Sequence, residues 1–548
     1  MSTGRVLVDS DETVEVTRVG WHSPLEQHPT ACPEALDYLS FLRYRLTGGP
    51  AEAHDADAIL VLQPGNYGGP SSLDCLANTV LRRGVEQVLA VEVWALARRS
   101  AGLEDSAGVR AAFAADAPDI AFDYYFNGAV VDGSVFEGIK ANRDVPFLAE
   151  FGFARVIRDM HETLERFVPD PEVRRQKVFI GGHSGGAIVA AAFGAWDFDG
   201  IPGHDMCRGF VALDTPVDCD FGLRTHPALR VAGWPVPSLA EALYPHVVGG
   251  LRSGVLPRIS GSSVALMSYA LRVYATYAYL SPEVESNLNE RITTSLAAGA
   301  YHRVWRILTR LIFSTGLRQV LTGRPRFRYT SAAEFGMWLG AAVSPVGVGG
   351  ISVGSLDGPQ GPRSFPVPAW AWRVPVVRGL VGFLLGEKPL AGPTDPEHLY
   401  RWNSAVGTGQ SAEMAASAKA FAGRAAVCFE PYHASRYTID QAFVMAGARC
   451  GDLASIQHER GMRAKPLLSL FAGLVPFAPR LPFVNVGEAH VIRGYTHVDV
   501  GFAVPRPDGV PEPLADLITS FLLRHTAPVD NRGGMDEPGR ASGFRLAR

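Results

Sequence analysis

The chain has 548 residues, of which 47% are hydrophobic and 19% charged, so it can bury a sizeable core and is not disordered as a whole. Its 51 basic and 55 acidic residues give a formal net charge of −4. This balance argues against a nucleic-acid-binding protein, which needs a concentrated basic surface. The six cysteines lack CxxC spacing and indicate neither a disulfide framework nor a zinc module.

The two ends and one apolar stretch bear on localisation. The first residues, MSTGRVLVDSDETVEV, lack the basic start and apolar core of a signal peptide, so we expect a cytoplasmic protein. Residues 335–356 carry no charge, but they include six glycines and a proline, which suit a mobile apolar covering segment better than a transmembrane helix. Residues 527–548 are polar and rich in glycine, proline and arginine, which predicts a disordered tail.

The first part of the chain alternates strand-like and helix-like segments. Strands are predicted at 5–8, 13–19, 58–63, 87–94, 177–180 and 209–213. Helices are predicted at 35–46, 71–83, 151–167 and 187–193, the second of them capped by Ser71 or Ser72. Strands that are apolar on both faces and alternate with helices predict a parallel sheet covered on both sides.

The alternation stops at about residue 219 and resumes at about 465. The intervening part is irregular and rich in Gly, Pro, Trp and Tyr, with helix-like pieces at 264–280 and 303–313. Strands at 466–472 and 488–495 and a helix at 512–525 complete the pattern. We therefore predict an N-terminal hairpin and helix extension (1–54), a core in two parts (55–218 and 465–526), a cap insertion (219–464) and the tail (527–548).

The most informative motif is Gly-His-Ser-Gly-Gly at 182–186, directly after one predicted strand and before the next predicted helix. G-x-S-x-G in this context is typical of a nucleophile elbow, with Ser184 at the tip of a strained turn. Other segments of the backbone must come close to this turn, which explains why the two elbow positions, Gly182 and Gly186, are glycine. The alternative is a glycine-rich turn whose serine only caps the helix.

With this motif the sequence resembles the α/β-hydrolase superfamily, and within it the esterase- and lipase-like serine hydrolases. The resemblance covers about residues 55–218 and 465–526, and its other marks are Gln-Pro-Gly-Asn at 63–66 and Gly-Tyr-Thr-His at 494–497. It implies an α/β-hydrolase fold: a mostly parallel sheet covered by helices on both faces, with a large, mainly helical or irregular cap insertion.

A serine hydroxyl is a weak nucleophile until a base removes its proton. His497 has the best context for that base, because it follows a β-like run and a Gly-Tyr-Thr turn and precedes the final helix, where the family places its histidine. The alternative is a polar turn residue. The order of serine before histidine also agrees with the family.

The acid of the triad departs from the usual family position. The loop after the strand that follows the cap, 473–481, holds no carboxylate. Asp214 lies directly after the strand at 209–213, a position that some members use, and we expect it to fix the tautomer of His497. Glu488 is the alternative acid, and Asp214 could instead serve only the turn that follows it.

The resemblance implies an oxyanion hole made of backbone N–H groups, from Gly185 together with Asn66 or Tyr67. A plain glycine turn is the alternative for the loop at 65–69. We expect no cofactor and no metal, because this loop lacks the Gly-Lys-Ser/Thr ending of a phosphate loop and the Asp-Cys-Asp run at 218–220 has no matching ligand partners, which makes it structural.

These features predict a serine hydrolase that cleaves a carboxylic ester of a small molecule, and the apolar insertion suggests a hydrophobic one. Trp370, Trp372 and residues 376–385 could line an acyl pocket or make weak contact with a membrane surface, although burial in the cap is the simpler interpretation. The alternatives are an amidase or acyltransferase with the same serine, or a catalytically silent binding protein of this fold. The oligomeric state does not follow from the sequence.

Overall fold

The computed structural model describes residues 3–25, 32–220, 223–224, 230–231, 234–296, 301–322, 326–367, 390–403, 411–473, 487–506 and 508–526. The predictions for the aromatic group at 370–385 and for the tail at 527–548 lie outside these residues.

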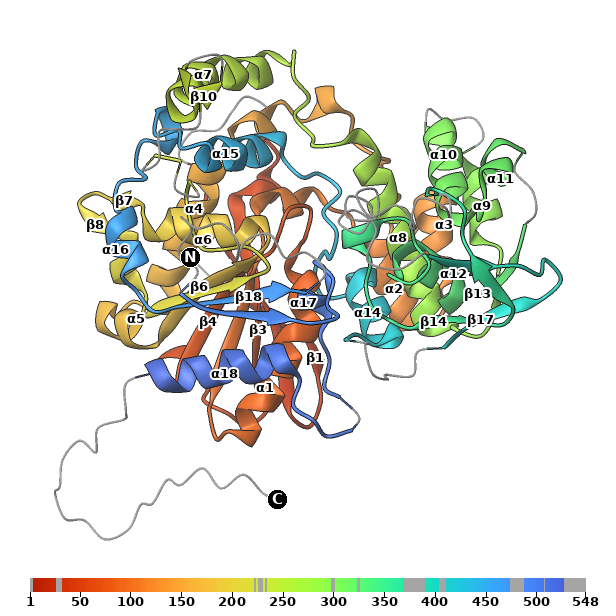
Figure 1. Cartoon of the computed structure of the whole chain (residues 1–548), viewed down its shortest axis with the longest axis horizontal. Coiled ribbons are helices and arrows are strands. Elements are labelled where there is room, and N and C mark those ends of the chain that lie inside the picture. Colours follow the sequence, from red (N-terminus) through yellow and green to blue (C-terminus); the bar gives the residue numbers. More distant parts are fainter. Residues whose placement is uncertain are drawn as a thin grey trace, which may run out of the picture.

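A nine-stranded sheet forms the centre of the core (Figure 1). Its strands are, in order across the sheet, β1 (Thr3–Ser10), β2 (Val14–His22), β3 (Tyr38–Leu46), β5 (Val91–Leu96), β4 (Ala58–Gln63), β6 (Val178–His183), β9 (Gly209–Leu213), β18 (Leu467–Ala472) and β19 (Glu488–Ile492). The pairs from β1 to β5 are antiparallel, and every pair from β5 to β19 is parallel. The predicted, mostly parallel sheet is confirmed.

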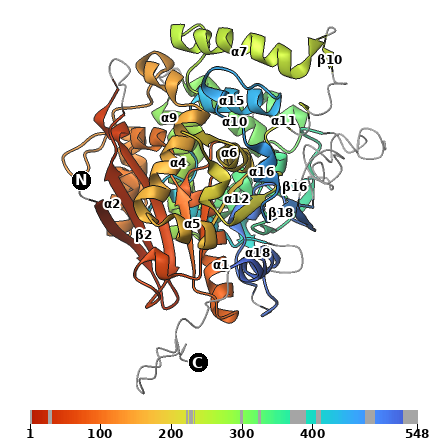
Figure 2. The same cartoon turned by 90° about the vertical axis from the view of Figure 1, so that its left-hand side faces the viewer.

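Helices cover both faces of this sheet, as the two views show (Figures 1 and 2). The covering helices are α4 (Phe153–Phe167) and α6 (Gly185–Gly194) on one face, and α1 (Asp74–Glu86) and α18 (Pro513–His525) on the other. Successive side chains of a strand point to opposite faces, so Ile59 belongs to the first apolar core and Leu60 to the second. Both residues are completely buried, which explains why the central strands are apolar throughout.

The helix predicted at 35–46 is wrong, because most of this segment forms strand β3. Its apolar residues have helical spacing, but the Tyr, Phe and Leu side chains also suit a strand. β3 pairs along its whole length with β2 and, on its other edge, with β5. The hydrogen bonds from two neighbouring strands therefore decide the conformation, and the local spacing does not.

The other predicted strands and helices are present, with ends shifted by up to four residues. The cap predicted for the helix at 71–83 is wrong, however. A 3-10 turn at Pro70–Leu73 precedes α1, which begins at Asp74. The hydroxyls of Ser71 and Ser72 donate to the carbonyl oxygens of Ala426 and Gly69 instead of accepting from the helix.

The residues predicted to form the cap divide between two places. α7 (Val236–Ser253) and α15 (Ser435–Met445) lie over one end of the core, where α15 packs on α4 and α6 (top of Figure 1). Most of the other described residues of the predicted cap form a side lobe around α8 (Ser262–Leu280), α12 (Ser331–Leu339) and α14 (Met414–Ala422), whereas α16 (Glu459–Arg463) packs on α6.

The side lobe also takes two helices from the first core part, α2 (Ala107–Ala115) and α3 (Asp119–Asn127), both of which pack on α8. The uncharged stretch at 335–356 lies inside this lobe, with Phe335, Trp338 and Ile351 buried. Among the described residues, no helix combines the length and the apolar character needed to cross a membrane.

A buried ion pair joins β3 to β5 and provides a test of their pairing. Arg43 Nε lies 2.8 Å from Glu92 Oε2, and the two side chains are only 8% and 3% exposed. Replacing Arg43 by Met leaves the Glu92 carboxylate buried without its counter-charge, so we expect the free energy of unfolding to fall by about 3 kcal/mol or more. The measurement is urea unfolding of the full chain.

Arg45 is the matched control, because it lies two residues further along β3 and pairs with Glu15, where both side chains are about one quarter exposed. Arg45→Met should cost only about 0–1 kcal/mol. Equal losses in the two variants would contradict the buried pairing of β3 with β5.

Candidate active site

Ser184 lies in the sharp turn between β6 and α6. Its backbone angles, φ 54° and ψ −124°, are rare for a residue other than glycine. Its N–H donates to the Leu213 carbonyl at 2.9 Å, and its own carbonyl accepts from Ala187 N–H at 3.0 Å. The side chain does not cap α6, although every residue of that helix is described. This geometry is that of a nucleophile elbow.

The elbow glycines allow β4 to lie directly against the start of α6. A Cβ added at Gly186 would lie 2.0 Å from the Gln63 oxygen, and one added at Gly182 would lie 2.3 Å from the Gly186 carbonyl carbon. Both positions therefore require glycine. The same close approach brings the loop after Gln63 to the nucleophile, where a Cβ on Gly65 would be 3.1 Å from Ser184 Cβ.

His497 and Asp214 meet beyond the carboxyl ends of β19 and β9. His497 Nδ1 lies 2.5 Å from Asp214 Oδ2, and Asp214 Oδ1 accepts from Ala472 N–H at 2.7 Å. Burial raises the pKa of the Asp214 carboxyl, which the hydrogen bond and charge of His497 oppose. Because His497 Nδ1–H donates to the Asp214 carboxylate, Nε2 is the ring nitrogen that can accept a proton. No hydrogen bond within 3.5 Å links Ser184 Oγ to His497 in the described part of the chain.

Glu488, the alternative acid, lies at the opposite end of β19 from His497. Its carboxylate lies 3.1 Å from His490 Nε2 and accepts from Arg524 at 2.6 Å. The remaining strand residues separate it from Ile492 by about 13 Å at the usual rise per residue. The structure therefore brings Asp214, and not Glu488, to His497.

His183, the residue before Ser184, contacts both the ring and the backbone of His497. Their ring centroids are 4.6 Å apart, and His183 Nε2 lies 2.8 Å from the His497 carbonyl oxygen. Burial lowers the pKa of His183 to about 3, so the ring is neutral and Nε2–H donates to that carbonyl. The motif thus supplies a residue that fixes the backbone of the neighbouring histidine.

Arg98 holds the loop that follows β4. Its guanidinium donates to the carbonyl oxygens of Gly68 at 2.7 Å, of Pro64 at 2.9 Å and of Gly65. It also forms an ion pair with Glu430 at 3.0 Å, in which the side chains are 4% and 1% exposed. All three acceptors belong to the loop that carries Asn66 and Tyr67, so the guanidinium fixes the path of this loop.

The insertion holds the same loop from its other side. The Tyr67 carbonyl accepts from Glu430 N–H at 2.7 Å, and Glu430 accepts from His433 Nδ1–H at 3.0 Å. Tyr67 itself has a φ of 61°, which is uncommon for a tyrosine. Sequence reasoning missed Arg98 and Glu430, because they are 332 positions apart and belong to no recognisable motif.

Two carboxamides lie beside Gly185. A Cβ on this glycine would be 2.5 Å from Asn66 Oδ1 and 2.8 Å from Gln441 Oε1. Both oxygens are buried and have no hydrogen-bond partner among the described residues. Gln441 comes from α15, so this helix of the insertion contributes a polar group next to the nucleophile.

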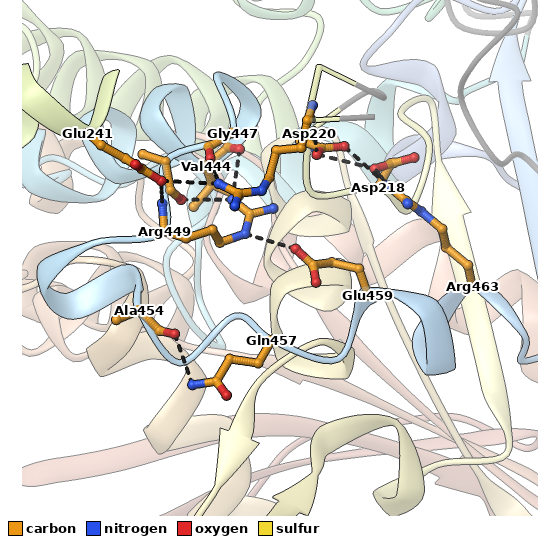
Figure 3. Close-up of polar contacts among 12 residues, drawn as sticks. Asp218, Asp220, Glu241, Val444, Gly447, Arg449, Ala454, Gln457, Glu459 and Arg463 are labelled. Atoms are coloured by element: carbon orange, nitrogen blue, oxygen red, sulfur yellow. Dashed lines mark hydrogen bonds and ion pairs between the residues drawn. The ribbon is translucent and has the colours of Figure 1, made fainter. Parts of the chain in front are cut away.

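A network of arginines anchors the chain that leaves Asp214 (Figure 3). Arg463 lies 2.8 Å from Asp218 and 3.2 Å from Asp220, so both acidic residues of the Asp-Cys-Asp run form ion pairs with one arginine. Figure 3 also shows Arg449 between Glu459 and Glu241; its side chain donates to Glu459 at 2.9 Å and its backbone N–H to Glu241 at 3.1 Å. In the described ranges, no cluster of His, Cys, Asp or Glu could hold a metal ion.

Comparisons with known proteins add little to this geometry. No family profile and no curated protein matches the chain. Solved structures that superpose on it include a protein assigned as a lipase from Sulfolobus solfataricus, with 11% identity, a TM-score of 0.41, and 96% and 99% of the two chains covered. Another is the peroxisomal α/β-hydrolase Lpx1 from Saccharomyces cerevisiae, with 11% identity, a TM-score of 0.35, and coverage of 95% and 92%.

The class of fold follows from the core itself. The sheet order, the elbow after β6 and the position of His497 after the last strand of the sheet define an α/β-hydrolase fold. The protein has this fold, with β1 as an additional antiparallel edge strand and a large insertion between β9 and β18.

Proposed function

We propose that the protein is a serine hydrolase that cleaves a carboxylic ester of a small molecule. The observation that carries the proposal is the 2.5 Å contact between His497 Nδ1 and Asp214, at the same edge of the sheet as the strained turn at Ser184. This combination supplies a nucleophile, a base and an acid that orients the base. The fold alone would not favour one reaction, because unrelated activities share it.

In the proposed mechanism, His497 Nε2 takes the proton of Ser184 Oγ as this oxygen attacks the ester carbonyl. The hydrogen bond between Ser184 Oγ and His497 Nε2 forms when substrate binds, since catalytic hydrogen bonds are often long or poorly aligned in unliganded enzymes. The N–H groups of Gly185 and of Asn66 or Tyr67 stabilise the tetrahedral oxyanion. His497 then protonates the leaving alcohol and activates water for attack on the acyl-enzyme, while Asp214 stabilises the imidazolium.

The same serine would serve an amidase or an acyltransferase, and both remain alternatives. The hydrophobic substrate expected from the insertion stays a prediction. A silent binding protein would keep the fold but would not react with a serine-directed probe.

Replacing Ser184 by Ala tests the nucleophile. We expect the wild-type chain to be labelled by a fluorophosphonate and to hydrolyse nitrophenyl esters, and the variant to lose labelling and about 10⁶-fold in kcat. Ser106→Ala, outside the site, should behave as wild type. An unlabelled wild-type chain would favour the binding protein, and faster cleavage of an anilide than of the matching ester would favour an amidase.

The two candidate acids can be separated by isosteric variants. Asp214→Asn should lower kcat by about 10⁴-fold, because the amide cannot stabilise the imidazolium or fix the tautomer. Glu488→Gln should change kcat by less than about threefold, because Glu488 contacts His490 and Arg524 instead of His497. Steady-state hydrolysis of a nitrophenyl ester provides the measurement. A greater loss in Glu488→Gln than in Asp214→Asn would refute the choice of Asp214.

The Arg98–Glu430 pair is expected to position the oxyanion loop. The double variant Arg98→Met/Glu430→Gln removes both charges and so avoids an unpaired buried ion. We expect kcat to fall by about 10²-fold with little change in KM, because the loop no longer aims its N–H groups at the transition state.

Arg99→Met/Asp159→Asn is the matched control, because this neighbouring pair is also buried and joined at 3.0 Å but holds the carbonyls of Ser23 and Leu36 instead. It should destabilise the fold to a similar extent while retaining kcat. Equal effects of the two double variants on kcat would show that Arg98 has only a structural role.

A further inference from the structure

A cavity lies in the side lobe, between α9 (Leu288–Ser295), α10 (Tyr301–Phe313) and the strands β12 (Glu285–Ser286) and β13 (Arg328–Thr330). Its volume is about 580 Å³, which is within the usual range for sites of small molecules. Figure 1 shows these elements on the outer side of the lobe, away from α6 and the candidate active site. The proposed hydrolase activity does not use this cavity.

Most of the acidic residues that line the cavity are already paired. Glu285 accepts from Arg328 at 2.7 and 2.8 Å, and Glu290 lies 3.4 Å from Arg326. Glu334 is buried and accepts from the Ser286 hydroxyl and from Asn289 N–H. Burial raises the pKa of Glu334 to about 7, so its charge is only partly present at neutral pH.

Two lining arginines lack such partners. Within the described residues, no carboxylate lies in ion-pair distance of Arg306 or Arg310. They are four positions apart on α10, so their side chains lie on the same face of the helix, where like charges repel. The cavity therefore has a local excess of positive charge that the chain itself does not neutralise.

A further donor lines the cavity. Gln319 accepts from Thr315 N–H at 2.7 Å through its carbonyl oxygen, which leaves its NH₂ group as a donor. Arginine and amide donors together suit an oxygen-rich anion, which guanidinium groups bind through paired hydrogen bonds.

We propose that this cavity binds a small molecule through an anionic oxygen group such as phosphate, sulfate or carboxylate. Arg306 and Arg310 hold the anionic group, and Gln319 donates a further hydrogen bond. The proposal is independent of the chemistry at Ser184, and it gives the side lobe a function in ligand binding.

The test is binding of inorganic phosphate, sulfate and citrate to the full chain, followed by calorimetry and thermal melting against sodium chloride at equal ionic strength. We expect saturable binding of at least one of these anions. Arg306→Gln/Arg310→Gln should weaken binding by about 10-fold or more, since each charged hydrogen bond contributes substantially to affinity. The anion that binds most tightly identifies the group.

Arg318→Gln is the matched control, because Arg318 is exposed, lies beside Gln319 and does not line the cavity. It should bind as wild type, and fluorophosphonate labelling of Ser184 should be unchanged in all variants if they fold. Absence of saturable binding, an equal effect of chloride, or undiminished affinity in the double variant would overturn the proposal, whatever the outcome at Ser184.

Discussion

The buried ion pair between Arg98 and Glu430 is the interaction on which the arrangement of the site depends. Removing two charges from water is costly, and the other hydrogen-bonding groups of the pair offset part of this cost, apart from Arg98 Nε, which has no partner in the described part of the chain. Arg98 uses them on three carbonyls of the loop after β4, and Glu430 uses one of its oxygens on His433. If the core and the insertion separated here, the Arg98 guanidinium and the Glu430 carboxylate would lose their hydrogen-bond partners. The insertion is therefore part of the scaffold that shapes the proposed oxyanion hole.

Among the described residues other than glycine, seven have a positive φ, and three of them lie where this scaffold meets the proposed chemistry. Tyr67, Ser184 and Asp214 all have a positive φ, at 61°, 54° and 52°. Such conformations cost of order 1–3 kcal/mol each and persist only where the surroundings enforce them. The backbone bonds to Glu430, Leu213 and Leu470 provide that enforcement. The three residues come from three different loops. The sheet fixes where these loops lie relative to one another, and the adjacent backbone segments fix the conformation of each residue.

Much of the core could be predicted because its signals are local. A strand, a Gly-His-Ser-Gly-Gly turn and a helix follow each other within 20 residues, and strand order then brings the ends of β9 and β19 close to Ser184. The helix predicted at 35–46 was wrong because two neighbouring strands outweigh local spacing. Arg98, Glu430 and Gln441 could not be found in the same way, since each acts through contacts with distant residues that no periodicity records.

The apolar composition of the insertion now has an explanation that does not involve substrate. Tyr274, Trp305 and Trp338 form a buried aromatic cluster in the side lobe, with centroid distances of 5.3–6.3 Å. These side chains stabilise the lobe itself and lie on its own helices. What the insertion contributes next to Gly185 is the carboxamide of Gln441, a polar group. Composition of the whole insertion is thus a poor guide to the substrate, because the apolar residues of this cluster stabilise the lobe while a polar one lies beside Gly185.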